Sequence, residues 1–432
     1  MQVIKQAIFS IELKNTYKLS NKDFTRSRKQ SFSGTLLFMM NRITKTLSIE
    51  IDNFIRVLKR NPDSSNAETF TKSAFVQYRQ KIKAEVFKQL SNSLVHEFYT
   101  DNDDSLKLWR GFRLLAVDGS RLTLPNTKEL QKSFGVVRNQ SDSAITQGRI
   151  SVLYDVLNGF VIDGVLSPLS KSENDLALGH LDYSTEGDLI LYDRGYPSFE
   201  MMYKHKKRRV DFLFRVQSNF NNQVKAFIST KKQMQIEYIY PGKDTRFSDK
   251  EYSKESSILV RFNKVILSDG SVEVLISSLL DELKYDNSLF KDLYFKRWKI
   301  ETFYDELKNK LKLGDFSGYS VQSIYQDFYS SLFVSNIQTL LVGEINDELK
   351  EKEQETKYLY KVNANISYGI LKDRIIELFF SNNEMDQITK DIKELLKRNI
   401  IPVRPNRSFM RDSGKYRKRT KPNVTKNQKD AF

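Results

Sequence analysis

The spacing of apolar side chains predicts helices in the first quarter of the chain. Apolar residues recur every three or four positions in Ser33–Arg60 and in Thr71–Tyr99, which is the spacing of helices that bury one face. A loop at Arg60–Asn66 separates the two stretches, and Ser73 is the expected cap of the second. We therefore assign residues 1–110 to one helical region.

The first turns of the helix expected within 71–99 are crowded with polar and basic side chains. They are Gln77, Arg79, Gln80, Lys81 and Lys83. A helix that enters a groove of DNA carries such side chains, but so does an ordinary solvated helix face. The pattern alone leaves both interpretations open.

The pattern changes to short apolar runs after residue 110, which predicts strands. The expected strands are Phe112–Thr127, Ile145–Val156, Gly159–Leu166, Leu189–Tyr192 and Val210–Val216. Between them, Ser172–Leu181 has the pattern of a helix capped by Ser172. Alternating strands and helices indicate an α/β core, which we place at 111–216 and, after an interruption, at 285–343.

The interruption at 217–284 is polar, rich in lysine and patterned as strands, with turns at Tyr240–Gly242 and Ser268–Gly270. We interpret it as a β-rich insertion. Helices are expected again at Gln322–Val342 and, within a C-terminal helical region at 344–403, at Ile366–Phe380 and Asp386–Arg398.

The tail at 404–432 is basic and poor in apolar residues, a composition typical of segments that are disordered when free. It fits a phosphate-binding arm as well as a solubilising tail.

Net charge narrows the class of partner. The 432 residues carry a formal charge of +16, which favours a polyanion; nucleic acid is the commonest and an acidic membrane surface the main rival. No apolar run approaches the about 18 residues of a membrane span, and the first residues lack the apolar core of a signal peptide. The sequence has no cysteine and three histidines. Any metal is therefore expected on carboxylates, which suit Mg²⁺ or Mn²⁺.

One helix expected at Tyr294–Lys308 gathers the candidate chemistry. At 100° per residue, one side of this helix gathers Tyr294, Arg297, Glu301, Asp305 and Lys308. A carboxylate that holds a metal, flanked by cations that hold phosphate oxygens, suits a phosphate-handling site. A solvated helix face of mixed charge is the other interpretation.

Two aspartates upstream stand beside expected strands. Asp118 lies in an Asp-Gly-Ser context in or just beyond the first strand, and Asp193 directly follows Leu189–Tyr192. Such positions hold active-site groups in α/β folds. A hairpin turn at Asp118 and a structural turn at Asp193 are the alternatives.

The spacing Tyr294-x2-Arg297-x3-Glu301-x6-Lys308 resembles the signature of the DDE transposases of the insertion sequence four family. In that family the first acid stands in an Asp-Gly-Ser or Asp-Gly-Thr context and the second in Asp-Arg-Gly-Tyr, as at Asp118 and Asp193. The resemblance covers about residues 112–320. It implies an RNase H-like mixed-sheet core with a β-rich insertion, a helical DNA-binding region before it, and C-terminal helices with a basic tail after it.

The resemblance also implies a site and a cofactor. Asp118, Asp193 and Glu301 are the expected catalytic acids and the ligands of two Mg²⁺ or Mn²⁺ ions, with Asp118 bridging both. The expected DNA-binding residues are Tyr294, Arg297, Lys308 and Arg194. Asp305 departs from the pattern, because some relatives carry a basic residue there.

The implied activity is hydrolytic nicking at the ends of an insertion sequence, followed by strand transfer into target DNA. The implied partners are terminal inverted repeats, target DNA and a second copy of the chain in a synaptic complex, with no membrane, in the bacterial cytoplasm at the nucleoid. An aromatic of the insertion is expected to stack on a flipped base or to fill the core; the candidates are Phe220, Tyr238, Tyr240, Phe247, Tyr252 and Phe262. A metal nuclease of the same fold without strand transfer, and a catalytically inactive DNA-binding repressor, are the alternative functions.

Overall fold

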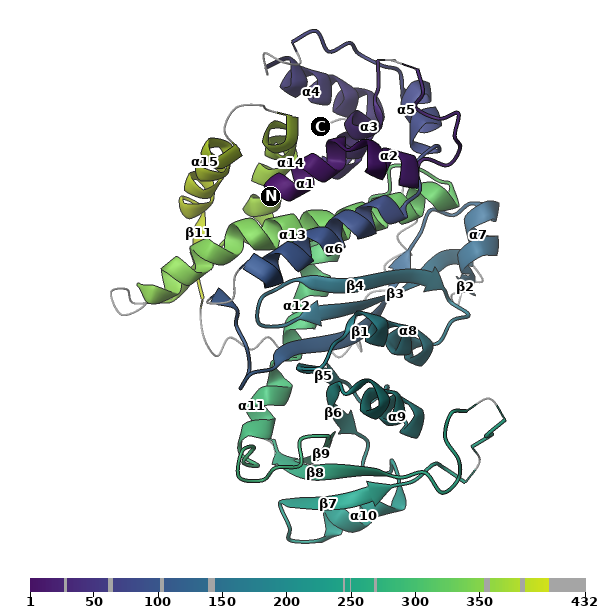
Figure 1. The fold of residues 1–432 in the computed structure, drawn as a ribbon, viewed down its shortest axis with the longest axis vertical. Coiled ribbons are helices and arrows are strands. Elements are labelled where there is room, and N and C mark those ends of the chain that lie inside the picture. Colours follow the sequence, from purple (N-terminus) through teal and green to yellow (C-terminus); the bar gives the residue numbers. More distant parts are fainter. Residues whose placement is uncertain are drawn as a thin grey trace, which may run out of the picture. The chain divides into compact units, whose positions relative to one another are not determined.

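A computed structural model describes residues 1–26, 29–60, 65–101, 105–138, 144–243, 245–248, 250–267, 270–352, 358–380 and 385–403. The basic tail at 404–432 and the centre of the turn expected at Ser268–Gly270 lie outside these residues. The chain folds as two compact units (Figure 1). The first comprises Met1–Asp101, Arg121–Gly148 and the residues from Asp305 on, and the second comprises Asn102–Ser120 and Arg149–Tyr304.

A mixed sheet carries the second unit. Its strand order is β4-β3-β1-β5-β6-β9-β8-β7. The strands are β1 (Arg113–Thr123), β3 (Ala144–Asp155), β4 (Val161–Pro168), β5 (Asp188–Tyr192), β6 (Asp211–Val216), β7 (Met234–Ile239), β8 (Ile258–Ile266) and β9 (Val272–Ser277). β5 runs parallel to both β1 and β6, whereas β6 and β9 are antiparallel. The order β4-β3-β1-β5-β6 with three parallel strands is that of an RNase H-like core, as predicted.

The centre of this sheet is buried, which explains its apolar sequence. Leu114–Val117 of β1 and all residues of β5 are almost fully buried, as expected of parallel strands covered on both faces. At their shared starting edge the Arg113 guanidinium donates two hydrogen bonds of 2.7 and 2.6 Å to Asp188. This bidentate pair stabilises the register that brings the ends of β1 and β5 together.

Helices α8 (Glu173–His180) and α9 (Phe199–Arg208) follow β4 and β5. Ser172 caps α8 with a complete capping box, as predicted. At the other end of α8, buried His180 contacts Asp163 of β4 at 2.7 Å and Ser151 of β3 at 2.9 Å. These contacts fix α8, and with it Glu173, against the sheet.

The stretch 217–284 extends the sheet instead of forming a sheet of its own. β9 pairs with β6 from Leu213↔Ser277 to Val216↔Val274, and β8 and β7 continue outward from β9. The stretch also contains a helix that the polar pattern did not predict, α10 (Asn222–Ser229), which is capped by Asn221. Of the candidate stacking aromatics, Tyr252 and Phe262 are buried, whereas Tyr238 and Tyr240 are exposed.

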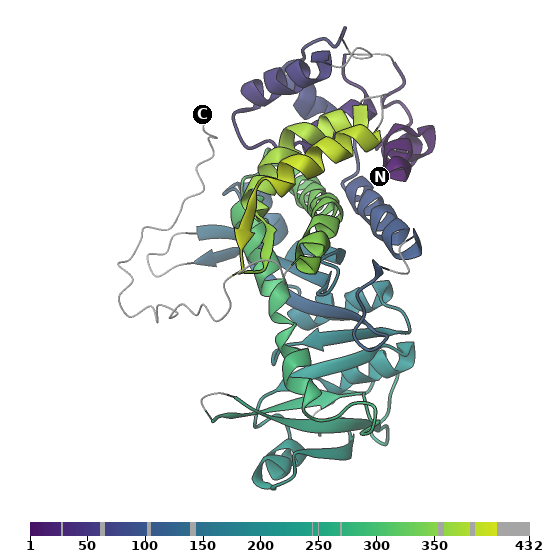
Figure 2. The ribbon, with the colours of Figure 1, turned by 90° about the vertical axis from the view of Figure 1, so that its left-hand side faces the viewer.

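The first unit is mainly helical. Its helices are α1 (Gln2–Phe9), α2 (Ile11–Tyr17), α3 (Phe32–Met40), α4 (Leu47–Arg60), α5 (Lys72–Arg79), α6 (Glu85–Asp101), α7 (Lys128–Phe134), α13 (Val321–Glu351), α14 (Ala364–Phe380) and α15 (Met385–Lys397). Figure 2 shows α14 and α15 side by side, running across α13, and both helices contact α13, as does α6. Short strands pair at two places: β2 (Val136–Arg138) with the start of β3, and β10 (Tyr360–Val362) with β11 (Ile400–Pro402). α13 is longer than predicted, and the expected cap Ser73 is wrong because Thr71 caps α5.

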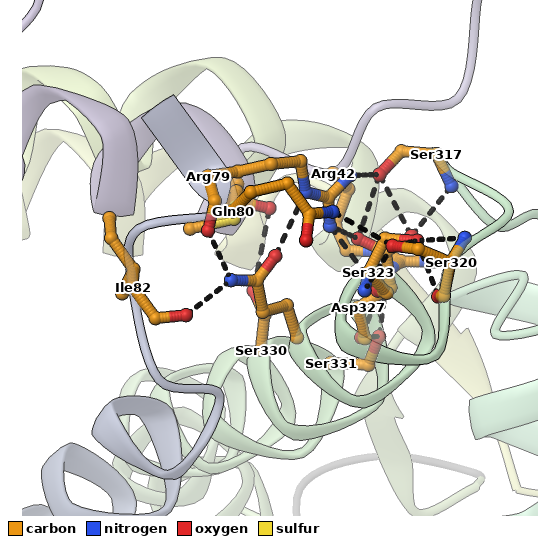
Figure 3. Close-up of polar contacts among 12 residues, drawn as sticks. Arg42, Arg79, Gln80, Ile82, Ser317, Ser320, Ser323, Asp327, Ser330 and Ser331 are labelled. Atoms are coloured by element: carbon orange, nitrogen blue, oxygen red, sulfur yellow. Dashed lines mark hydrogen bonds and ion pairs between the residues drawn. The ribbon is translucent and has the colours of Figure 1, made fainter. Parts of the chain in front are cut away.

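A buried polar cluster joins α5 to the start of α13 (Figure 3). Arg79 is 1% exposed and contacts Asp327 at 2.9 Å, Gln326 at 2.9 Å and Ser317 at 2.6 Å. Burial alone raises the pKa of Asp327, but the charge of Arg79 and the bonds from Ser317 bring it below its usual value. Arg79 therefore serves the interior of this unit and is not free to contact DNA.

Arg42 lies beside this cluster. It is buried, with φ of 57°, and donates to Ser331 at 2.7 Å and to the carbonyls of Leu311 and Lys312 at 3.1 Å each. The break that this residue makes between α3 and α4 explains why the stretch Ser33–Arg60 is not one continuous helix.

His205 gives the second unit a measurable dependence on pH. Its ring, fully buried on α9, lies 2.9 Å from the Tyr192 hydroxyl and 3.0 Å from the carbonyl oxygen of Val210. Burial lowers the pKa of His205 to about 4. Below pH 6.5 the unfolded chain binds a proton that the folded chain does not, so stability falls as the pH drops from 6.5 towards 4.

We expect the free energy of unfolding to fall by roughly 2 kcal/mol more in the native protein than in His205→Gln when the pH drops from 7 to 5. Urea unfolding of both proteins at the two pH values measures the difference. Equal losses would contradict a neutral, buried His205.

Candidate active site

Asp118 lies within β1 and not in a hairpin turn, because the strand continues to Thr123. The backbone N–H of Gly119 donates to its carboxylate at 2.9 Å, and the Tyr304 hydroxyl donates to its carbonyl oxygen at 2.7 Å. Burial raises the pKa of the Asp118 carboxyl to about 6, with further upward contributions from the charges of Glu301 and Asp193. The site thus concentrates negative charge around Asp118.

Asp193 directly follows β5, as predicted from the apolar run before it. Its Oδ1 accepts a hydrogen bond of 3.1 Å from the Tyr294 hydroxyl and lies 2.8 Å from Nη2 of Arg215. Burial alone raises the pKa of Asp193, but these partners, the charge of Arg297 and the backbone N–H of Arg194 bring it below its usual value. Asp193 is therefore held as a carboxylate.

The expectation of one long helix at Tyr294–Lys308 is wrong. The structure has α11 (Leu289–Phe295), a turn at 296–297, α12 (Trp298–Asp305) and a π-helical turn at Glu306–Lys310. At the turn, hydrogen bonds join residues three apart: Lys296 to Leu293 and Arg297 to Tyr294. Hydrogen bonds between residues three apart wind the backbone more tightly than an α-helix, so the regular period of 3.6 residues is lost at this turn.

The break places Arg297 in the interior, against Glu301. The Arg297 side chain is 3% exposed, and its Nη2 donates to Glu301 Oε1 at 2.9 Å. Its guanidinium lies 5.7 Å from the centre of the Tyr294 ring, and its charge acts on both Asp118 and Asp193. The three acids thus share one buried cation.

The acids have the right chemistry for a hard metal ion but do not form a closed set of ligands. Carboxylate oxygens are the donors that Mg²⁺ and Mn²⁺ prefer, and the raised pKa of Asp118 reflects negative charge that a cation would balance. Among the described residues, no group of three or more acidic or histidine side chains is placed to hold a metal ion. Arg297 takes one oxygen of Glu301. We conclude that the residues fit a divalent cation by donor type.

The other two expected DNA-binding residues are Arg194 and Lys308. Arg194 is exposed after β5. Lys308 belongs to the first unit, where its Nζ donates to the carbonyl oxygen of Arg121 at 3.0 Å. Asp305, the departure from the family pattern, is exposed and accepts a bond of 2.7 Å from Asn309.

Sequence reasoning missed several side chains of the site. Arg215 joins Asp193 to Glu273 at 2.8 and 2.7 Å. The sequence signal for Arg215 was a charge inside the otherwise apolar run Phe212–Val216 of β6, because a charged side chain requires a partner when it is buried. Tyr196, in the Asp-Arg-Gly-Tyr context, is buried near Asp118 and Glu173 and was not assigned a role.

Comparison with known proteins defines the class. Residues 109–337 match the family model described as the transposase DDE domain. The match spans more than half of the chain, so the chain belongs to the DDE transposases, which are divalent-metal-dependent enzymes that cleave DNA and transfer its strands. The prediction of a transposase is confirmed, and none of the matches favours the nuclease or the repressor.

The chain is also similar to one curated relative and to one solved structure. The chain is 19% identical to the transposase InsG for insertion sequence element IS4 of Escherichia coli (strain K12) over 343 residues. This alignment covers 78% of this chain and 75% of that protein. The chain is also similar to a piggyBac transposase in a synaptic complex with hairpin DNA, with 9% identity, a TM-score of 0.42 and coverage of 94% and 86%. Among the described residues, no helix has the length and apolar character needed to cross a membrane.

Proposed function

We propose that this chain is an insertion-sequence transposase in which Asp118, Asp193 and Glu301 hold two Mg²⁺ or Mn²⁺ ions. It would cleave DNA at the ends of its element and join the freed 3′-hydroxyls to target DNA. The observation that carries the proposal is that three acids from distant parts of the sequence all interact with buried Arg297 in the second unit, which bonds to Glu301 at 2.9 Å, and that Asp118 interacts electrostatically with the other two acids.

When bound, divalent ions supply a water or 3′-hydroxyl nucleophile and a stabilised leaving oxygen. The chain's own residues prepare the ligands for this chemistry. Tyr294 and Arg215 orient Asp193 through Oδ1, and the Gly119 N–H orients Asp118. Asp118, Asp193 and Glu301 would hold these ions through their carboxylate oxygens.

We assign Arg297 a role different from the phosphate contact that the family signature suggests. Its side chain is 3% exposed and bonded to Glu301. It would hold Glu301 in place and balance the charge of the acids, and Tyr294 would serve Asp193 in the same way. Arg194 and Lys308 remain the candidates for DNA contacts, because the first is exposed and the second is partly exposed.

The partners follow from the same function. They would be terminal inverted repeats, target DNA and a second copy of the chain, in the bacterial cytoplasm at the nucleoid. The helical region at 1–110 would bind DNA together with the tail at 404–432; the net charge of +16 supports this assignment.

The test is a reaction of the full chain with duplexes that carry the inverted repeats flanking its coding DNA. With Mg²⁺ or Mn²⁺ we expect nicks that leave 3′-hydroxyl ends, followed by products in which those ends are joined to target DNA. Cleavage without joining would support a nuclease instead, and binding without cleavage a repressor.

A further inference from the structure

The backbone beside Asp118 is closely approached by two side chains that the proposed mechanism does not use. An added methyl group at Gly119 would lie 3.3 Å from Cγ of Glu173 and 3.3 Å from the hydroxyl oxygen of Tyr196. Glycine therefore leaves room for both side chains against the strand. Glu173 is the first residue of α8, and the contacts of His180 fix that helix on β3 and β4.

Arg149 of β3 reaches the same place. Its Nη1 donates to Glu173 Oε1, and its side chain is 16% exposed. The guanidinium has five N–H donors, yet its Nε is buried with no hydrogen-bond partner, and so is the Tyr196 hydroxyl. Buried donors without acceptors are costly in a folded protein and call for an explanation.

An anion with several acceptor oxygens would satisfy both donors. The guanidinium fork matches two oxygens of a phosphate, and the Tyr196 hydroxyl can donate to a third acceptor site. The Glu173 side chain, 48% exposed, now presents one charged carboxylate oxygen to Arg149. If Glu173 turned towards solvent, it would leave Gly119 and uncover Tyr196.

We propose that Arg149 and Tyr196 form a binding site for one DNA phosphodiester beside Asp118, and that Glu173 occupies Arg149 until DNA is bound. This inference rests on the proposed function, because it requires DNA as the ligand. The inference adds to the proposed function a phosphate contact by Arg149 of β3. It also adds an ion pair within the chain, between Glu173 and Arg149, that competes with DNA.

The test measures binding of the full chain to a duplex carrying the element end, over a series of salt concentrations and without divalent metal, so that cleavage does not interfere. Each phosphate contact contributes about 0.9 to the slope of log affinity against log salt. Glu173→Gln should bind DNA several-fold more tightly with an unchanged slope, because Arg149 contacts the phosphate in both bound complexes. Arg149→Gln should bind more weakly with a slope shallower by about 1. The double variant should behave as Arg149→Gln alone, since Glu173 acts through Arg149.

Two controls separate this role from structural ones. Asp182→Asn breaks another exposed ion pair of the second unit, with Arg208, and should leave the affinity for DNA unchanged. Tyr196→Phe removes a hydroxyl that has no partner, so it should keep or raise the melting temperature while weakening DNA binding several-fold. Tyr192→Phe, which removes a bond to His205, should lower the melting temperature and leave DNA binding unchanged.

Unchanged affinity and slope in Glu173→Gln and Arg149→Gln, with normal DNA binding by the native protein, would overturn the phosphate site and leave the proposed function standing. A double variant that binds as tightly as Glu173→Gln would overturn the competition. Failure of the native protein to bind DNA would overturn the proposed function and this inference together.

Discussion

Glu301→Gln is expected to abolish strand cleavage while leaving the affinity for DNA ends intact. Glutamine keeps the length of the side chain and its place opposite Arg297, but it removes the charge that would hold a cation. Metal ions supply several kcal/mol of transition-state stabilisation, which corresponds to a rate loss of roughly 100- to 10,000-fold. Nicking of labelled element ends with Mg²⁺ or Mn²⁺, together with gel-shift titration, measures both quantities.

Asp118→Asn and Asp193→Asn should likewise lose strand cleavage and keep their affinity for DNA ends, because all three acids would hold one pair of ions. Asp305→Asn is the matched control: it removes an exposed carboxylate one turn after Glu301 that accepts a hydrogen bond from Asn309. It should leave cleavage nearly unchanged. Undiminished cleavage by Glu301→Gln would reject this site.

Arg79→Ala is expected to cost the first unit about 3–5 kcal/mol of unfolding free energy, the range for removing one partner of a buried ion pair. The variant leaves Asp327 buried and without its cation, and it also removes the bonds to Gln326 and Ser317. Denaturant unfolding followed by circular dichroism, with hydrogen exchange in the first turns of α13, measures the loss.

Glu68→Gln provides the control for this prediction. It breaks the pair with Lys29 in the same unit, where both side chains are more than 60% exposed, and such pairs contribute little because water screens them. The double variant Arg79→Met with Asp327→Leu should lose less stability than Arg79→Ala, because it leaves no unpaired buried charge. A small effect of Arg79→Ala would contradict the importance of the cluster.

Local signals were sufficient to place one of the three acids, Asp193, in the fold. Asp193 could be placed from sequence because a short apolar run and a Gly-Tyr-Pro break define the end of β5. For Asp118 the hairpin alternative fails only because β1 continues for five residues beyond it. Strand length of this kind depends on neighbouring strands, which the local pattern does not contain.

Arg297 shows where helical periodicity misleads. A regular period of 3.6 residues places it on a polar stripe next to Glu301, which suggests exposure. The turn between α11 and α12 keeps that adjacency but buries the side chain. The sequence also missed the burial of Arg79, because its partners Gln326 and Asp327 lie about 250 positions away. The pattern of its own helix therefore suggested a solvated or DNA-facing surface.

The strands of 217–284 illustrate the difference between recognising an element and placing it. Their alternating pattern predicted strands correctly, but the pairing of β9 with β6 depends on the buried edge that β6 offers. Tertiary pairing of this kind is set by the partner strand and not by composition.

The way the first unit is assembled has a consequence for its synthesis. Buried Glu50 bonds to Lys372, 322 positions later, at 2.7 Å. At about 5–20 residues per second, translation delivers that lysine roughly 16–64 s after Glu50. Until then the nascent helices of the first hundred residues present unpaired apolar faces outside the ribosome, where chaperones bind. We therefore expect a ribosome that stalls before residue 372 to release a product that cannot complete this unit and is a substrate for proteolysis.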